Sequence, residues 1–161
     1  MELNQLFSNI WLCDDDEEDH FVFGQAISEV LPQSRLTTFL NGSELLFQLQ
    51  THQPDILFLD INMPMQNGIE CLKTIRDHSF LRKLPVVIYS VSEHHIDLKA
   101  SYGMGATVYL IKPHVYQELV QQLKALFRLD WQHPNLITDL HFSKGTFIPF
   151  NELLRSSQTD L

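Results

Sequence analysis

Short apolar runs alternate along the chain with segments of helical period. Five runs have the length of a strand, and apolar residues fill them almost continuously, although threonines interrupt the second. Continuous runs of this length are typical of strands buried on both faces, as in a parallel sheet covered by helices. The predicted strands are 10–13, 35–39, 56–59, 86–89 and 107–111.

The segments between these runs predict helices, because their apolar residues recur at spacings of three and four. We expect Asp16 to cap the first helix, which Pro32 ends. Residues 41–44 read as a turn and cap before the second helix. Pro113 is expected to open the fifth, since proline is tolerated in a first turn. The apolar periods of the five helices lie within 23–31, 45–49, 69–75, 93–102 and 113–127.

A strand followed by a helix, five times over, predicts an α/β domain. Its sheet should be doubly wound, parallel and five-stranded, with right-handed crossovers. The domain is expected to cover residues 6–130, and residues 131–161 form a short C-terminal extension of unknown role. In such folds the ligand site lies beyond the carboxyl ends of the strands, so the residues that follow each run are the candidates for function.

Polar residues follow directly after four of the five predicted strands. Asp14 and Asp15 come after the first, and Asp60 after the third. Ser90 follows the fourth, and Lys112 follows the fifth. Because the carboxyl ends of parallel strands meet at one edge of the sheet, we expect three carboxylates, a hydroxyl and an ammonium group to converge there.

This combination predicts phosphoryl transfer to a carboxylate. Three clustered carboxylates repel one another unless some protonate or a cation joins them. Mg²⁺ is the expected cation, since it takes oxygen ligands and keeps waters that a phosphate can replace. Lys112 supplies a positive charge and Ser90 a hydrogen-bonding hydroxyl for the phosphoryl oxygens. A carboxylate nucleophile such as Asp60 can form an aspartyl-phosphate.

Composition and charge limit the cellular compartment and the kinds of partner that we expect for this protein. The net charge of −9 argues against direct nucleic-acid binding, which needs Lys and Arg to neutralise phosphates. Apolar runs are too short to span a membrane, and residues 1–4 carry no basic segment that would begin a signal peptide. Cys13 and Cys71 are too few for a disulfide framework. These features predict a cytoplasmic protein without membrane contact.

With these residues the chain resembles the receiver domains of bacterial response regulators, over about residues 6–130. The pattern Asp-x-x-Met-Pro-x-x-x-Gly followed by Tyr-x-x-Lys-Pro is highly specific in this order and spacing. The resemblance implies the sheet order 2-1-3-4-5 of the CheY-like, or flavodoxin-like, fold and a stand-alone phosphoacceptor of a two-component phosphorelay. It rests on residues 12–16, 59–64 with Gly68, 88–90 and 109–113.

The resemblance also implies the metal and phosphate roles. Asp60 would be the phosphorylated residue and a Mg²⁺ ligand. Asp15 would bind Mg²⁺ directly, and Asp14 directly or through water. Asn62 would offer its backbone carbonyl to the metal. Lys112 would pair with Asp60 and then with the phosphoryl group.

A conformational switch is implied as well. Ser90 would bind the phosphoryl group and shift toward it, and Tyr109 would then swing inward. The Lys112–Pro113 bond would be cis. The phosphoryl donor would be a histidine kinase or a histidine phosphotransfer protein. Signalling to a downstream protein target would use the surface of 93–102, 107–111 and 113–127.

Two positions depart from the family's pattern. Ser90 stands where threonine is commoner, so its coupling to Tyr109 would be looser. Val91 stands where the family usually places alanine or glycine, and its β-branched side chain would narrow access to Asp60. Taken alone, Tyr109 reads as a half-buried packing residue, and the acidic run 14–19 reads as a solvated loop or helix start.

Two other functions remain as alternatives. The first is a receiver-like protein-binding module that is never phosphorylated, which Val91 favours slightly. The second is a hydrolase that passes through an aspartyl-phosphate. Such enzymes need an acid two residues after the nucleophile, where this chain has Asn62.

The C-terminal extension carries weaker signals. Residues 130–135 read as a break, 142–148 as a turn between extended pieces, and 151–155 as the start of a short helix. We expect an appendage that packs on the domain or mediates a homodimer, with plain disorder as the alternative. It is too short and too poor in basic residues for a usual DNA-binding effector domain.

Overall fold

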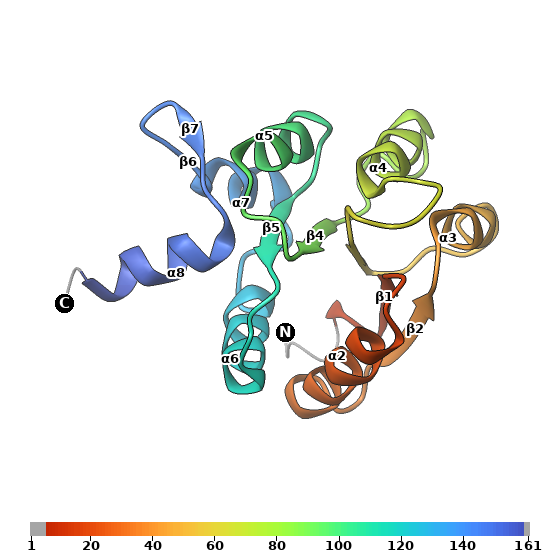
Figure 1. The fold of residues 1–161 in the computed structure, drawn as a ribbon, viewed down its shortest axis with the longest axis horizontal. Helices are drawn as coiled ribbons and strands as arrows, with labels where there is room; N and C mark the ends of the chain where they lie inside the picture. The colour runs from red at the N-terminus through yellow and green to blue at the C-terminus, as the bar shows by residue number, and fades with distance from the viewer. Residues whose placement is uncertain (1–5, 160–161) are drawn as a thin grey trace.

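A computed structural model describes residues 6–159 and contains one five-stranded sheet in which every neighbouring pair of strands is parallel (Figure 1). The strand order is β2-β1-β3-β4-β5, which confirms the predicted fold class and order. The expectation that no signal peptide is present rests on residues 1–4, which lie outside the described residues. The strands are β1 (Asn9–Cys13), β2 (Arg35–Phe39), β3 (Ile56–Leu59), β4 (Val86–Ser90) and β5 (Val108–Ile111).

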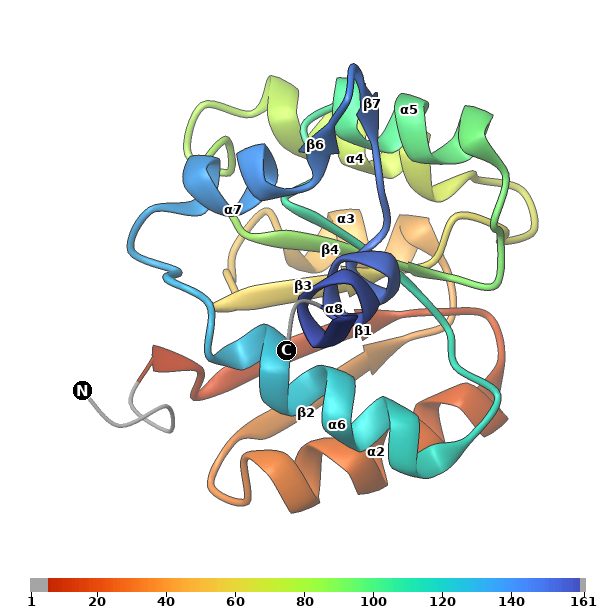
Figure 2. The same ribbon diagram turned by 90° about the vertical axis from the view of Figure 1, so that its left-hand side faces the viewer.

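Helices cover both faces of this sheet (Figures 1 and 2). One face carries α2 (Glu17–Val30) and α6 (Tyr116–Phe127). The other carries α3 (Gly42–Gln48), α4 (Gly68–Asp77) and α5 (His95–Gly103). The alternating side chains of the strands therefore enter two separate apolar cores, as expected for strands buried on both faces.

The helix starts confirm two predicted caps and correct one boundary. The Asp16 side chain accepts a hydrogen bond from the Glu18 amide at 2.9 Å, and that of Asn41 accepts one from the Glu44 amide at 2.9 Å. The prediction that Pro113 opens the fifth helix is wrong. Val115 is still extended, with φ −113° and ψ 127°, so α6 begins only at Tyr116 and a short loop follows β5.

The C-terminal extension is folded onto the β5 edge of the sheet. It contains α7 (Pro134–Leu140), a hairpin of β6 (Phe142–Ser143) and β7 (Thr146–Phe147), and α8 (Phe150–Thr159). Figure 2 shows the hairpin beside α5 and α8 in front of the sheet. Trp131, Ile137 and Phe150 are buried in the core on the α2/α6 face. These contacts match the expectation of an appendage packed on the domain.

None of the helices in the described part of the chain combines the length and the apolar character needed to cross a bilayer. The longest of them, α2, has 14 residues. It carries acidic residues in its first turn and buries one face against the sheet, as a helix of a layered domain does.

A buried histidine joins the extension to α5. His141 is 0% exposed, and its Nδ1 lies 2.8 Å from the Ile137 carbonyl oxygen. Its ring lies between those of Tyr102 and Phe150, and Nε2 has no hydrogen-bond partner among the described residues. Burial lowers the pKa of His141, which favours the neutral ring in the folded protein.

We expect this histidine to make stability depend on pH. Because its folded pKa lies below the unfolded value of about 6.5, the unfolded chain binds the extra proton. The stabilisation is complete above that value and is lost as pH falls below it. Between pH 7.5 and 5.5, the wild type should lose stability relative to a His141→Phe variant in urea unfolding, with an upper limit of about 1.4 kcal/mol for a ring that stays neutral throughout. If the free energy of unfolding changed with pH in the same way for both proteins, the His141 ring would not be held neutral.

Candidate functional site

The backbone around the site is held by hydrogen bonds that continue past the strand ends. The Asp14 amide donates to the Phe39 carbonyl at 3.0 Å, and the Asp60 amide donates to the Cys13 carbonyl at 2.9 Å. The Lys112 amide donates to the Ser90 carbonyl at 2.8 Å. These bonds fix the strand ends beside one another, as the sequence predicted from the ends of parallel strands.

Three carboxylates gather at this edge. Asp14, Asp15 and Asp60 each bring one carboxylate oxygen to within 4.8 Å of the others. Asp14 is 0% exposed and Asp60 is 5% exposed, whereas Asp15 faces solvent. The cluster is therefore closed toward the core and open on one side, where a small ion or a phosphoryl group can enter.

Lys112 lies in the same cluster and contacts three carboxylates. Its Nζ is 2.5 Å from Asp14 Oδ2, 2.7 Å from Asp19 Oδ2 and 3.3 Å from Asp60 Oδ2. Burial lowers the pKa of Lys112, but the hydrogen bonds to Asp14 and Asp19 and the charge of Asp60 more than offset this. The net shift is upward, so the ammonium group stays charged.

Burial and Lys112 shift the pKa values of the two buried carboxylates in opposite directions. Burial raises the pKa of Asp14 and of Asp60, and Lys112 opposes this in both cases. Ser90 and the backbone of Asn62 also lower the pKa of Asp60. A carboxylate whose ionised form is costly to bury gains from any further positive charge that reaches it.

An unpartnered atom shows where that charge would fit. Asp60 Oδ1 is buried and has no hydrogen-bond partner among the described residues. A second cation beside Asp14, Asp15 and Asp60 would satisfy it. Carboxylate and carbonyl oxygens are the ligands that Mg²⁺ prefers, and the open side leaves room for waters. The donor set therefore fits Mg²⁺, and Asn62, exposed two residues after Asp60, lies on the rim.

The predicted switch residues form one connected group. Ser90 is 0% exposed, and its Oγ accepts a hydrogen bond from the Ser92 amide at 3.3 Å. The Tyr109 hydroxyl donates to the Ser92 carbonyl at 2.9 Å, and the ring is 0% exposed. Tyr109 therefore already points inward, whereas Val91 is 62% exposed at the rim.

The resemblance implied a cis Lys112–Pro113 bond, and this expectation is wrong. No peptide bond among the described residues is cis. The trans form is the one that an X–Pro bond favours intrinsically, by about 0.5–1 kcal/mol.

Asp19 is a site residue that the sequence analysis placed only in the acidic run. It lies in the first turn of α2, where its carboxylate reaches Lys112. Its only signal in the sequence is its place three residues after the Asp16 cap, in the first turn of the expected helix.

This chain is similar to known proteins in both sequence and fold. The family model of the response regulator receiver domain matches residues 10–124. The DNA-binding transcriptional regulator NtrC of Salmonella typhimurium is 37% identical over 114 residues, which are 69% of this chain and 23% of NtrC. The transcriptional regulatory protein CrdR of Helicobacter pylori is 30% identical over 115 residues, 70% of this chain and 54% of CrdR. The chain thus matches about a quarter to a half of these relatives' lengths.

Solved structures agree with the fold. The phosphorylated cyanobacterial phytochrome response regulator RcpA is 26% identical with a TM-score of 0.70, covering 74% of this chain and 91% of RcpA. The chemotaxis response regulator CheY4 of Vibrio cholerae is 22% identical with a TM-score of 0.66, covering 74% of this chain and 98% of CheY4. Because the family model covers most of the chain, the protein belongs to the response regulator receiver domain family of two-component signalling.

Proposed function

We propose that this chain is a phosphoacceptor in which Asp60 receives a phosphoryl group from a phosphohistidine. The observation that carries the proposal is Asp60 itself, a buried carboxylate with one oxygen facing Lys112 and the other without a partner. A phosphoryl group on Asp60 would bring negative oxygens to the Lys112 ammonium. The phosphorylated state of RcpA, a relative in fold and sequence, supports the same chemistry.

Each residue of the site would contribute a separate part of the reaction. An Asp60 oxygen bonds to phosphorus as the P–N bond of phosphohistidine breaks, and the leaving imidazole takes up a proton. Lys112 and the Ser90 hydroxyl would stabilise the phosphoryl oxygens. Asp14, Asp15, Asp60 and the Asn62 carbonyl would hold Mg²⁺, which when bound neutralises charge on the transferring group.

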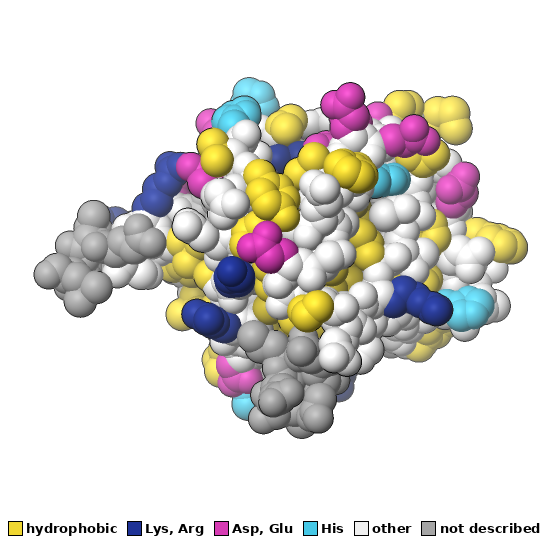
Figure 3. Space-filling model, turned by 90° about the horizontal axis from the view of Figure 1, so that it is seen from below, with side chains coloured by type: hydrophobic (Ala, Val, Ile, Leu, Met, Phe, Trp, Pro, Cys, Tyr) yellow, Lys and Arg dark blue, Asp and Glu magenta, His cyan; other side chains and the backbone are white. Residues whose placement is uncertain are grey.

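The donor we propose is a histidine kinase or a histidine phosphotransfer protein, and the output is a changed affinity for a downstream protein. Switching would run through Ser90 and Tyr109. The names of NtrC and CrdR describe transcriptional regulators, but this chain has a net charge of −9. On the face shown in Figure 3, lysine and arginine side chains are scattered rather than gathered in a stripe. We therefore propose a protein target in the cytoplasm, with no direct nucleic-acid or membrane contact. The assembly to test for this chain is a homodimer.

Intact mass after incubation with Mg²⁺ and phosphoramidate tests this proposal. The wild type should gain the mass of one phosphoryl group, and Asp60→Asn should gain none, because the amide cannot act as the nucleophile. Removing Mg²⁺ with a chelator should suppress the gain. Asp15→Asn serves as a second variant that keeps Asp60 and weakens Mg²⁺ binding. A folded wild type that binds Mg²⁺ but gains no mass would instead be a binding module with this fold.

A further inference from the structure

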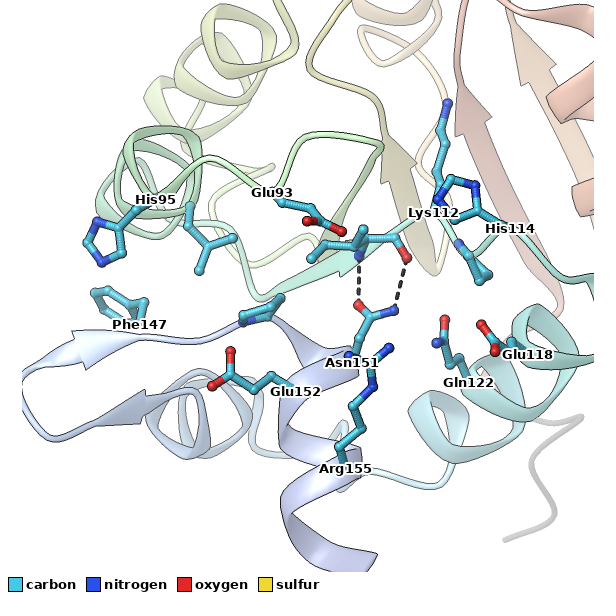
Figure 4. A pocket seen from close by; sticks show the side chains of 14 residues that line it. Glu93, His95, Lys112, His114, Glu118, Gln122, Phe147, Asn151, Glu152 and Arg155 are labelled. Atoms are coloured by element: carbon cyan, nitrogen blue, oxygen red, sulfur yellow. Dashed lines mark hydrogen bonds between the residues drawn. The ribbon is translucent and has the colours of Figure 1, made fainter.

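The outer edge of β5 is covered by the chain's own C-terminal segment. β5 is the last strand of the sheet, so the backbone groups on its outer side have no neighbouring strand. Such groups are ordinarily left to water or covered by another element. Here α8 lies beside β5 and the β6–β7 hairpin lies beside α5, as Figures 2 and 4 show. We name residues 142–159 the strap.

Asn151 of the strap takes the place of a strand neighbour. Its carboxamide accepts a hydrogen bond from the Ile111 amide at 2.8 Å and donates one to the Ile111 carbonyl at 3.0 Å (Figure 4). Asn151 is only 9% exposed, so water competes little for these bonds. One side chain thus satisfies both outward-facing backbone groups of Ile111.

Ile111 directly precedes Lys112, and the two residues are held from opposite sides. The Lys112 amide donates inward to the Ser90 carbonyl at 2.8 Å, while Ile111 is bonded outward to Asn151. Because successive residues of a strand direct their hydrogen bonds to opposite sides, the end of β5 is clamped between β4 and the strap. This clamp fixes the backbone from which the Lys112 side chain reaches Asp14 and Asp60.

A second tie holds the strap two residues earlier on β5. The Tyr102 hydroxyl accepts a hydrogen bond from the Tyr109 amide at 3.0 Å and donates one to the Ile148 carbonyl at 3.4 Å. The ring of Phe147 stacks on that of Tyr102, with centroids 4.6 Å apart. The strap is therefore bonded to β5 in the arrangement in which Tyr109 is buried.

A cavity separates part of α8 from α6 beside Asn151. It has a volume of about 410 Å³ and is lined in part by Glu118, Gln122 and Arg155 (Figure 4). Gln122 Oε1 is buried in this region without a hydrogen-bond partner among the described residues. The start of α8 borders this cavity, and the Asn151 carboxamide is its polar link to Ile111. Phe150, Leu153 and Leu154 add apolar contacts with the core.

We propose that Asn151 is a positioning residue for the phosphoacceptor site: through Ile111 it sets where Lys112 stands relative to Asp60. The C-terminal strap would thus complete a site whose other residues all come from the receiver fold. This inference rests on the proposed function, since positioning Lys112 matters to the reaction only if Asp60 is phosphorylated. A small misplacement of a charged group can slow a reaction by one to two orders of magnitude.

The test compares the wild type with Asn151→Ala and a matched variant, Ser157→Ala. Ser157 lies on the same helix, is exposed, and its hydroxyl bonds the Leu153 carbonyl. With phosphoramidate and saturating Mg²⁺, followed by intact mass, Asn151→Ala should be phosphorylated about 10-fold more slowly. Ser157→Ala should match the wild type.

Two further measurements separate positioning from general damage. Calorimetric titration with Mg²⁺ should give Asn151→Ala an affinity within about twofold of the wild type, because the proposed ligands follow β1 and β3. Hydrogen exchange of the Ile111 amide should be faster in Asn151→Ala. An unchanged rate of phosphorylation, unchanged exchange at Ile111, or a parallel loss of Mg²⁺ affinity would each overturn the inference alone. No mass gain in the wild type would overturn the proposed function and this inference with it.

Discussion

Replacing Lys112 by alanine should destabilise the protein strongly when no Mg²⁺ is present. Lys112 is the cation that Asp14, Asp19 and Asp60 share, and two of these carboxylates are almost fully buried. Removing one partner of a buried ion pair leaves uncompensated charge, which typically costs about 3–5 kcal/mol. Urea unfolding of Lys112→Ala in the presence of a chelator should show a loss of this size.

Mg²⁺ and a second substitution should each restore part of this loss. A cation at Asp14, Asp15 and Asp60 replaces some of the missing charge. At a free Mg²⁺ concentration of 100 times its dissociation constant, binding should add about 2.7 kcal/mol to the free energy of unfolding. Asp60→Asn in the Lys112→Ala background removes one of the unpaired carboxylates, so the double variant should be more stable than Lys112→Ala alone.

An exposed ion pair supplies the control. Lys73 lies 3.0 Å from Asp77, with both side chains more than half exposed. Lys73→Ala should change stability by less than about 1 kcal/mol, because water screens such pairs. If Lys112→Ala were no more costly than Lys73→Ala, the buried carboxylates would not depend on this ammonium group.

Phosphorylation should slow in Lys112→Ala even where Mg²⁺ restores its stability. The ammonium group faces the Asp60 oxygen and would stabilise the charge of the transferring group, and losing one such contact costs about 10²–10³-fold in rate. Stability and rate should therefore respond differently to Mg²⁺ in this variant.

The fold class and the central residues of the site could be predicted because both are marked by patterns of neighbouring residues along the chain. Buried parallel strands leave continuous apolar runs, and the first polar residue after each run marks the strand end. Asp14, Asp60, Ser90 and Lys112 were located in this way, and the structure brings them to one edge. The roles assigned to them remain predictions.

Long-range polar contacts could not be predicted in the same way. Asn151 lies 40 residues from Ile111 and Asp19 lies 93 residues from Lys112, so their contacts depend on how packed elements are placed. An asparagine or an aspartate in the first turn of a helix is ordinary in sequence, and nothing local marks a distant partner. The start of α6 was misplaced because proline permits a helix start but does not require one.

Gly68→Ala should damage both the fold and the site, because the backbone of Asp60 occupies the space that a side chain would need. A Cβ built on Gly68 would lie 1.9 Å from the Asp60 carbonyl oxygen and 2.8 Å from its carbonyl carbon. These are backbone atoms, so the start of α4 and the end of β3 must move apart. The Gly68 amide also donates to the Ile61 carbonyl at 2.9 Å, which ties the same two segments.

We expect Gly68→Ala to lower the free energy of unfolding by about 3 kcal/mol, at the upper end of overpacking costs. Its phosphorylation rate should fall at least about 10-fold, because Asp60 is displaced. Gly103→Ala is the matched control, since a Cβ there meets no atom within 4 Å at the end of α5. This control should be neutral or more stable by up to about 1 kcal/mol, because alanine favours a helix over glycine. Equal stabilities for the two variants would show that α4 can start farther from Asp60, and the rate of phosphorylation would then report whether that close approach matters to the site.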